Sequence, residues 1–251
     1  MQRSDSFATP RRLHVLPEAT ERLLECAKGA IPAGFSLVGG TALAEFYLGH
    51  RLSDDLDYFG QGEVDIPATV EVMVGALMAA GLTARRVASG PTFGRIEVGH
   101  GLRVDLVRDS PPTFGESRQV DGVWVASLLD IAVGKLGVFV TRREGKDAFD
   151  LAALAALAGL EPPALYPLLF RKDQGLRLYP QSVFEPLHAC AERLPMLPRS
   201  LRSELTAEVV QAFLQREAER FWDVSGLASM ASEAGTVGRA PGAEEIDEPS
   251  A

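Results

Sequence analysis

Hydrophobic residues recur along the chain with two different periods. Apolar residues three or four positions apart predict helices, whereas short apolar runs bounded by glycine predict strands. The first half mixes both patterns, and the second half has an almost entirely helical pattern interrupted by proline. We predict strands at 35–38, 55–59, 82–87, 94–98 and 102–107, and helices at 17–28, 41–48, 66–80, 127–141, 146–158 and 200–222.

This order of elements is typical of the α+β class, with a mixed sheet followed by a helical C-terminal half. The polar residues 1–12 are expected to be flexible, and residues 13–125 to form the α/β core. Residues 126–225 are expected to form a helical domain that completes the active site. Residues 226–251 are rich in glycine, alanine, glutamate and proline, so we predict a disordered acidic tail there.

Composition excludes some classes of protein. Of the 251 residues, 46% are hydrophobic, which is enough for a sizeable core, and the formal net charge is −9. A chain this acidic is expected to bind nucleic acid only through a local basic surface. Cys26 and Cys190 lack metal-ligand spacing and are expected to be small buried hydrophobes. The N-terminus has no signal-peptide pattern, and no apolar run reaches about 18 residues, so we expect a cytoplasmic protein without a membrane span.

The strongest chemical signal is a pair of acids in a predicted strand, Asp55-Leu56-Asp57. Residues i and i+2 of a strand point to the same face, so these carboxylates would lie about 5–7 Å apart. Two negative charges this close need a counter-cation, and Mg²⁺ (or Mn²⁺) suits carboxylate oxygens. The alternative interpretation is a solvated loop of acids.

Two further features favour a metal site that handles phosphates. Gly39-Gly40-Thr41 lies between an apolar strand and a helix, where glycine lets the backbone approach a phosphate, although an ordinary turn has the same pattern. Asp105 lies inside an apolar strand pattern, where an unpaired charge is costly. It could complete a three-carboxylate site of the kind that two-metal phosphoryl transfer uses, or it could pair with a nearby arginine.

Lys135 is the only charged residue between Ile131 and Val140. It must extend to the surface, pair with an acid or face a polar cavity, and a nucleoside triphosphate would suit it. From the sequence, Lys135→Met is expected to lower activity while keeping or raising stability, because it removes a buried charge. The charges that follow could form ordinary helix-surface pairs four residues apart, namely Arg143/Asp147 and Lys146/Asp150.

Four motifs then occur in the order found in one known family. They are VGGTALA at 38–44, GHRLSDDLDYF at 49–59, DIAVGK at 130–135 and REGKDAFDL at 143–151. Over residues 35–152, the chain resembles the AbiEii/AbiGii-type nucleotidyltransferase toxin family of the DNA polymerase β-like superfamily. One position departs from the family pattern, which often has Gly-Ser where this chain has Gly39-Gly40.

The resemblance implies a mixed-sheet nucleotidyltransferase core and a role for each matched residue. Asp55, Asp57 and Asp105 would bind the metal ions, and Asp105 would also help to deprotonate the acceptor. Lys135 would contact the triphosphate, and Asp150 would act with them as a catalytic residue close to the active site. The nucleotide-binding residues would be Gly39, Gly40, Thr41, Arg51, Ser53, Lys135, Lys146 and Asp147.

The resemblance also implies a reaction and its partners. A Mg²⁺- or Mn²⁺-dependent enzyme would transfer a nucleoside monophosphate from an NTP to a hydroxyl, and the expected acceptor is an RNA 3′ end such as that of tRNA. Members of the family resemble toxins of toxin–antitoxin and abortive-infection systems, so a cognate antitoxin is an expected partner. A small-molecule nucleotidyltransferase and a catalytically silent nucleotide-binding module remain alternatives. A basic rim for RNA could comprise Arg85, Arg86, Arg95, Arg103, Arg142 and Arg143.

Overall fold

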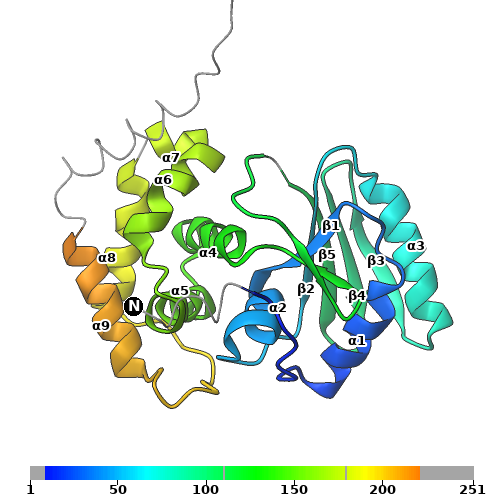
Figure 1. Ribbon diagram of the computed structural model, residues 1–251, viewed down its shortest axis with the longest axis horizontal. Helices are drawn as coiled ribbons and strands as arrows, with labels where there is room; N and C mark the ends of the chain where they lie inside the picture. Colours follow the sequence, from blue (N-terminus) through cyan, green and yellow to red (C-terminus); the bar gives the residue numbers. More distant parts are fainter. Residues whose placement is uncertain (1–8, 110, 179, 221–251) are drawn as a thin grey trace, which may run out of the picture.

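The computed structural model describes residues 9–109, 111–178 and 180–220. Figure 1 shows a mixed sheet on one side of the molecule and a group of helices on the other, with α4 between them. The predicted α+β class is confirmed. The strands are β1 (Phe35–Val38), β2 (Leu56–Gly60), β3 (Ala84–Ser89), β4 (Phe93–Val98), β5 (Leu102–Arg108), β6 (Arg118–Val120) and β7 (Val123–Val125).

Helices occupy most of the remaining described chain. The first half contains α1 (Glu18–Lys28), α2 (Gly39–Leu43), a π-helical turn (Ala44–Leu48) and α3 (Ile66–Ala79). The second half contains α4 (Leu128–Arg142), α5 (Gly145–Ala158), α6 (Pro162–Lys172), α7 (Gln174–Leu178), a 3₁₀ turn (Pro180–Val183), α8 (Phe184–Glu192) and α9 (Ala207–Arg220). The change from mixed to helical structure falls between β7 and α4.

Strand register decides which side chains share a face of the sheet. The strands lie in the order β3-β4-β5-β2-β1-β7-β6, and β2 runs parallel to β5. Leu56 pairs with Val104, and both are buried in the core on the side that α1 and α3 cover (Figure 1). Because successive side chains alternate between faces, the next pair, Asp57 and Asp105, points to the opposite side.

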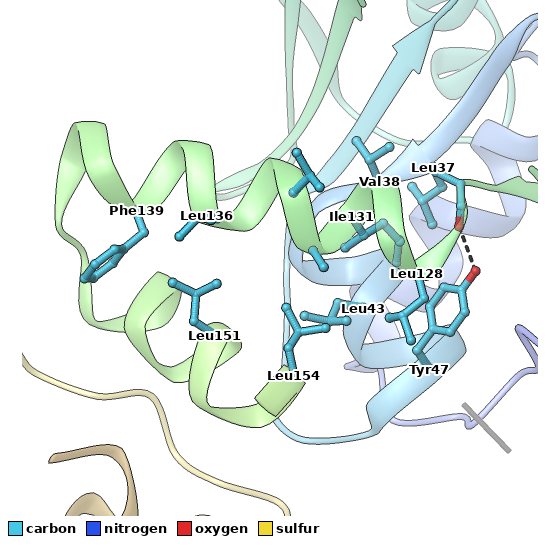
Figure 2. Close-up of a cluster of buried hydrophobic side chains, with 14 of the residues drawn as sticks. Leu37, Val38, Leu43, Tyr47, Leu128, Ile131, Leu136, Phe139, Leu151 and Leu154 are labelled. Atoms are coloured by element: carbon cyan, nitrogen blue, oxygen red, sulfur yellow. Dashed lines mark hydrogen bonds between the residues drawn. The ribbon is translucent and has the colours of Figure 1, made fainter. Parts of the chain in front are cut away.

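A second part of the core joins the sheet to the helical half. Figure 2 shows Leu43 and Tyr47 packed near Leu128 of α4 and Leu154 of α5. The Tyr47 hydroxyl donates a 2.7 Å hydrogen bond to the carbonyl of Ala126, just before α4 begins. Buried residues therefore run without a break across the expected domain boundary at 125/126.

The segment before α1 is held by a buried glutamate. Glu45 has no exposed surface and accepts backbone hydrogen bonds from Leu13, His14 and Val15. It also accepts a 2.9 Å hydrogen bond from Nε of Arg12, whose side chain is only 5% exposed. Arg11 and Arg12 thus make defined contacts, while residues 1–8 of the segment expected to be flexible lie outside the described residues.

Several other predictions differ from the structure at their edges. The short strands β6 and β7 were missed because three residues are too few to show a period. The last helix begins at Ala207 instead of Ser200, since residues 201–204 form bends and turns and residues 205–206 have no regular structure. The predicted disordered tail, 226–251, lies outside the described residues. No helix in the described parts of the chain combines the length and apolar character needed to cross a membrane.

Candidate active site

The three acids predicted as metal ligands line one cavity of about 190 Å³. Asp57 of β2 and Asp105 of β5 are direct neighbours in the parallel pairing, so they share the face opposite α3. Asp55 lies one residue before β2. The wall is formed almost entirely by charged side chains, and it also includes Gly40, Arg51, Leu52, Ser53, Asp54, Arg95, Arg103, Lys135, Arg142 and Lys146.

Two of these carboxylates are paired with arginines. Arg95 donates to both oxygens of Asp105 at 2.7 and 2.6 Å. Arg103 likewise contacts both oxygens of Asp55, one of them at 3.2 Å from Nε. The arginine pairing considered for Asp105 is therefore present, and Asp55 has the same kind of partner. The three carboxylates thus share one cavity, in which two of them are paired with arginines.

Asp57 differs from its two neighbours. Within the described ranges, no donor forms a hydrogen bond or ion pair with its carboxylate. Burial raises its pKa, the positive charge of Lys135 opposes that shift, and the negative charges of Asp105 and Asp55 add to it. Asp57 is thus a half-buried acid that lines both the sheet and the cavity, and its charge is compensated by Lys135 without a direct ion pair.

The Gly39-Gly40 turn lies directly against these groups. Gly39 has φ +69°, and a Cβ atom there would lie 2.2 Å from Oδ2 of Asp57. A Cβ atom on Gly40 would lie 2.4 Å from Nη2 of Arg51 and 2.9 Å from the Ser53 hydroxyl. Both positions therefore require glycine for close approach, and at Gly39 the left-handed backbone requires it as well.

Thr41 supports the site without lining it. Its side chain is buried, its hydroxyl donates to the carbonyl of Asp55, and its Oγ1 lies 3.0 Å from that of Ser53. Thr41 is absent from the wall of the cavity, whereas Ser53 is part of it. The threonine fixes the segment that carries Asp55, a role that the sequence did not suggest.

A second acid pair, on α5, lies behind the cavity wall. Asp150 has no exposed surface and accepts hydrogen bonds from Arg51 at 2.6 and 2.9 Å and from Nε2 of His50 at 2.8 Å. Lys135 Nζ lies 2.7 Å from the same carboxylate. Burial alone would raise the pKa of Asp150, but Lys135, Arg51 and His50 hold it well below its usual range.

Asp147 completes this arrangement. It is fully buried, accepts from Arg142 at 2.7 and 2.9 Å, and lies 3.6 Å from Lys135. Neither Asp147 nor Asp150 lines the cavity, but each holds cations that do. The predicted pairs Arg143/Asp147 and Lys146/Asp150 are wrong, because both acids face inward on α5 while Arg143 and Lys146 contact Glu185 and Glu144.

A second cavity of about 200 Å³ adjoins the first and shares Asp57, Lys135 and Arg142 with it. The sheet contributes Val38 and Phe59, and α4 contributes apolar side chains including Ile131. Lys172 of α6 contacts Asp109 at 2.9 Å across this space. The site thus combines a charged chamber with a more apolar one, and three charged residues line both.

Comparison with known proteins assigns the family. A family model described as the nucleotidyl transferase AbiEii toxin of type IV toxin–antitoxin systems matches residues 22–225. The chain belongs to this AbiEii family. The match extends the resemblance from residues 35–152 across most of the helical half.

Two solved structures are similar to the chain, and JHP933 supports the fold alone. JHP933 from Helicobacter pylori is similar with 18% sequence identity and a TM-score of 0.50, covering 89% of this chain and 100% of that chain. A candidate nucleotidyltransferase from H. pylori is 19% identical with a TM-score of 0.49, covering 82% of this chain and 96% of its own. No curated protein matches the chain.

Ion pairs with buried acids explain why Lys135 occurs in an otherwise apolar helix. Its side chain is 7% exposed, so it does not extend to the surface. Instead it pairs with acids from α5 and lines both cavities. His50, which belongs to the second motif but was given no role, also reaches Asp150. Asp150 lies 100 residues away, so no local pattern predicts its contact with His50. The motif that contains His50 is the one signal in the sequence that could have marked this residue.

The basic rim expected from six arginines of the sequence is divided in the structure. Arg95, Arg103 and Arg142 line the charged cavity. Arg85 and Arg86 of β3 do not, because they pair with Glu97 and Glu71 on exposed surface, and Arg143 contacts Glu185 instead. The six arginines therefore do not form one continuous surface around the site.

The carboxylates of Asp55, Asp57 and Asp105 are ligands of the type that a hard divalent cation prefers, but they are not arranged around such an ion. No group of three His, Cys, Asp or Glu side chains within the described ranges has a metal-binding arrangement. Asp105 and Asp55 are instead paired with Arg95 and Arg103. Three carboxylates on neighbouring backbone segments of one cavity nevertheless provide the oxygen ligands that Mg²⁺ prefers. The types of residue therefore suit Mg²⁺ or Mn²⁺.

Proposed function

We propose that this AbiEii-family protein transfers a nucleoside monophosphate from an NTP to the 3′ hydroxyl of an RNA such as tRNA. The observation that carries the proposal is the division of charge around one cavity. Asp55, Asp57 and Asp105 lie on the β2/β5 side, and Lys135 and Arg142 of α4 lie on the opposite side. Acids that can hold metal ions thus face cations that can hold a triphosphate, as phosphoryl-transfer sites require.

The acids would hold Mg²⁺ or Mn²⁺, which when bound neutralises the triphosphate and lowers the pKa of the acceptor hydroxyl. Asp105 would accept the hydroxyl proton as the acceptor oxygen bonds to the α-phosphorus. The bond from the α-phosphorus to the bridging oxygen would break, and pyrophosphate would leave. Asp57 lies beside Asp105 and close to Gly39, so its carboxylate would face the transferred group.

Arg51, Lys135 and Arg142 would bind the triphosphate, each held by a buried acid. Arg51 and Lys135 are anchored on Asp150, and Arg142 on Asp147. Such anchoring fixes the cations before the substrate arrives, which lowers the cost of reorganisation. Asp147 and Asp150 would then act as positioning residues, while Gly40, Ser53 and Lys146 border the phosphate path.

The nucleoside would occupy the second cavity, because Asp57 and Lys135 connect it to the charged one. Phe59 and Ile131 supply apolar surface for a base, and Lys172 and Asp109 supply polar contacts at its edge. A cognate antitoxin would regulate the enzyme, since the family is that of a type IV toxin–antitoxin system.

Labelling would test this function directly. Purified protein is incubated with each α-labelled NTP, Mg²⁺ or Mn²⁺, and total tRNA, and the products are resolved as RNA and as small molecules. Label in RNA, lost in Asp57→Asn, is the expected result. Pyrophosphate release without labelled RNA would indicate that the acceptor is a small molecule and not RNA. No release with any NTP would overturn the enzymatic proposal.

A further inference from the structure

The cations of the charged cavity fall into two sets according to the acids that hold them. Arg51, Lys135 and Arg142 are held by Asp147 and Asp150, which lie outside the cavity wall. The second set, Arg95 and Arg103, is held by Asp105 and Asp55, which are themselves acids of the candidate metal site. The second set therefore touches the groups that a metal ion would need.

A divalent ion and these arginines compete for the same atoms. Each guanidinium contacts both oxygens of its carboxylate, as the 2.7 and 2.6 Å hydrogen bonds from Arg95 to Asp105 show. A cation bound to the same carboxylate would also repel the guanidinium electrostatically. Metal binding by Asp55 and Asp105 thus requires that Arg103 and Arg95 turn away.

The acids that hold the cations, rather than exposure alone, separate the two sets, because Arg142 of the first set is 42% exposed while its two companions are buried. Side-chain exposure is 6% for Arg51 and 7% for Lys135, so these groups have little room to move. Exposure is 34% for Arg95 and 40% for Arg103, which border solvent at the open side of the sheet. Arginine side chains released there can bind the phosphates of a polynucleotide, for which their paired donors are suited.

We propose that Arg95 and Arg103 couple the binding of the RNA acceptor to the binding of divalent metal. The phosphate backbone of the RNA draws both arginines off Asp105 and Asp55, and the freed carboxylates then take Mg²⁺ or Mn²⁺. Without RNA, the same arginines keep metal affinity low. This coupling rests on the proposed function, because it takes RNA as the acceptor.

The coupling must be reciprocal. If RNA tightens metal binding, metal tightens RNA binding by the same factor. We expect a factor on the order of tenfold, within the roughly 5- to 150-fold range that is usual for coupled sites. Only partly exposed ion pairs must break, which places the factor at the lower part of that range.

Mn²⁺ binding tests the coupling without any turnover. Free Mn²⁺ is measured by its electron paramagnetic resonance signal in titrations of the full chain, without NTP, with and without a short single-stranded oligoribonucleotide. Binding of Mn²⁺ to the oligoribonucleotide alone is subtracted. The oligoribonucleotide should tighten Mn²⁺ binding to the wild type by about tenfold. The double variant Arg95→Gln/Arg103→Gln should bind Mn²⁺ tightly without the oligoribonucleotide. Adding the oligoribonucleotide should not tighten its Mn²⁺ binding further.

Arg85→Gln/Arg86→Gln is the matched control, because these arginines lie on the same sheet, pair with acids and do not line the cavity. It should behave as the wild type. Thermal melting checks that each variant is folded, and Arg103→Gln alone replaces the double variant if that one melts early.

Equal Mn²⁺ affinity in the wild type and the cavity variant would overturn the proposal. So would equal tightening by the oligoribonucleotide in both. Labelled transfer to RNA without this coupling would leave the proposed function intact, whereas coupling without transfer would refute the enzymatic function alone.

Discussion

Replacing Lys135 by methionine removes one charge from a buried network of ion pairs. Lys135 Nζ lies 2.7 Å from Asp150 and 3.6 Å from Asp147, and both acids are completely buried. Breaking such a pair by deleting one partner costs about 3–5 kcal/mol when the remaining charge is left alone. Asp150 keeps Arg51 and His50, and Asp147 keeps Arg142.

We therefore expect Lys135→Met to lower the free energy of unfolding by about 2–3 kcal/mol, below the value for an isolated partner. At roughly 2–4 °C per kcal/mol for a chain of this size, the melting temperature should fall by about 4–12 °C. The sequence alone predicts the opposite sign, because it shows a lysine among apolar residues but not the acids that face it.

The pH dependence gives a second readout. The pKa of Asp150 is held well below its usual range, so its ion pairs stabilise the fold above about pH 4. That contribution disappears as the pH falls through the depressed pKa and Asp150 becomes protonated. The difference in the free energy of unfolding between wild type and Lys135→Met should thus be largest at neutral pH and decrease in acid.

Thermal melting across pH and NTP-dependent transfer rates measure the two effects of Lys135→Met. The catalytic efficiency with NTP should fall by an amount equivalent to about 2–3 kcal/mol if Lys135 also binds the triphosphate. For the melting temperature alone, Lys172→Met is the matched control, because Lys172 pairs with one carboxylate at a partly exposed position. An unchanged or higher melting temperature for Lys135→Met would refute the stability argument, and an unchanged efficiency would refute the phosphate role.

Three further predictions follow from the same site. Asp57→Asn should abolish transfer and leave the metal-free melting temperature unchanged or slightly higher, because Asp57 is half-buried near other acids and has no hydrogen-bond partner among the described residues; a large drop on calorimetry would make Asp57 a structural residue. Gly39→Ala should cost at least about 1–3 kcal/mol and impair transfer, since it adds a clash with Asp57 to a left-handed backbone. Gly62→Ala has the same backbone strain without the contact, so equal losses in urea unfolding would contradict this reasoning. Burial lowers the pKa of His50. Below about pH 6.5 the unfolded chain therefore binds a proton that the folded chain does not, and the free energy of unfolding decreases as the pH is lowered. His50→Gln, which keeps a donor for Asp150, should flatten that fall between about pH 7 and pH 5, and identical melting profiles would exclude His50 as its cause.

Much of the first half could be predicted because its signals are local. The run at 35–38 is bounded by Gly39 and matches β1 residue for residue, and the alternation through Asp55-Leu56-Asp57 correctly separates a buried leucine from the acids beside it. What failed depends on distant partners. No local pattern shows that Arg51 reaches Asp150, 99 residues away, or that Arg103 turns onto Asp55.

The same limit explains the wrong pairs on α5. Spacing of four residues brings Arg143 and Asp147 within reach on any helix, so the pattern favours a surface ion pair. Asp147 and Asp150 instead face inward, where α4 presents Lys135 and Arg142. Which side of α5 is buried depends on packing against α4, and a motif of nine residues does not contain that information.

Asp150 also has a consequence for how such a protein can be recombined. Its partners come from both sides of the expected boundary at 125/126, with His50 and Arg51 from the first part and Lys135 from the second. A chimera that joined this sheet to the helices of a distant relative would leave charges buried without their counterparts. The two parts can therefore be exchanged only if all charged residues of this network are exchanged together. The sheet and the helices would thus be expected to evolve jointly.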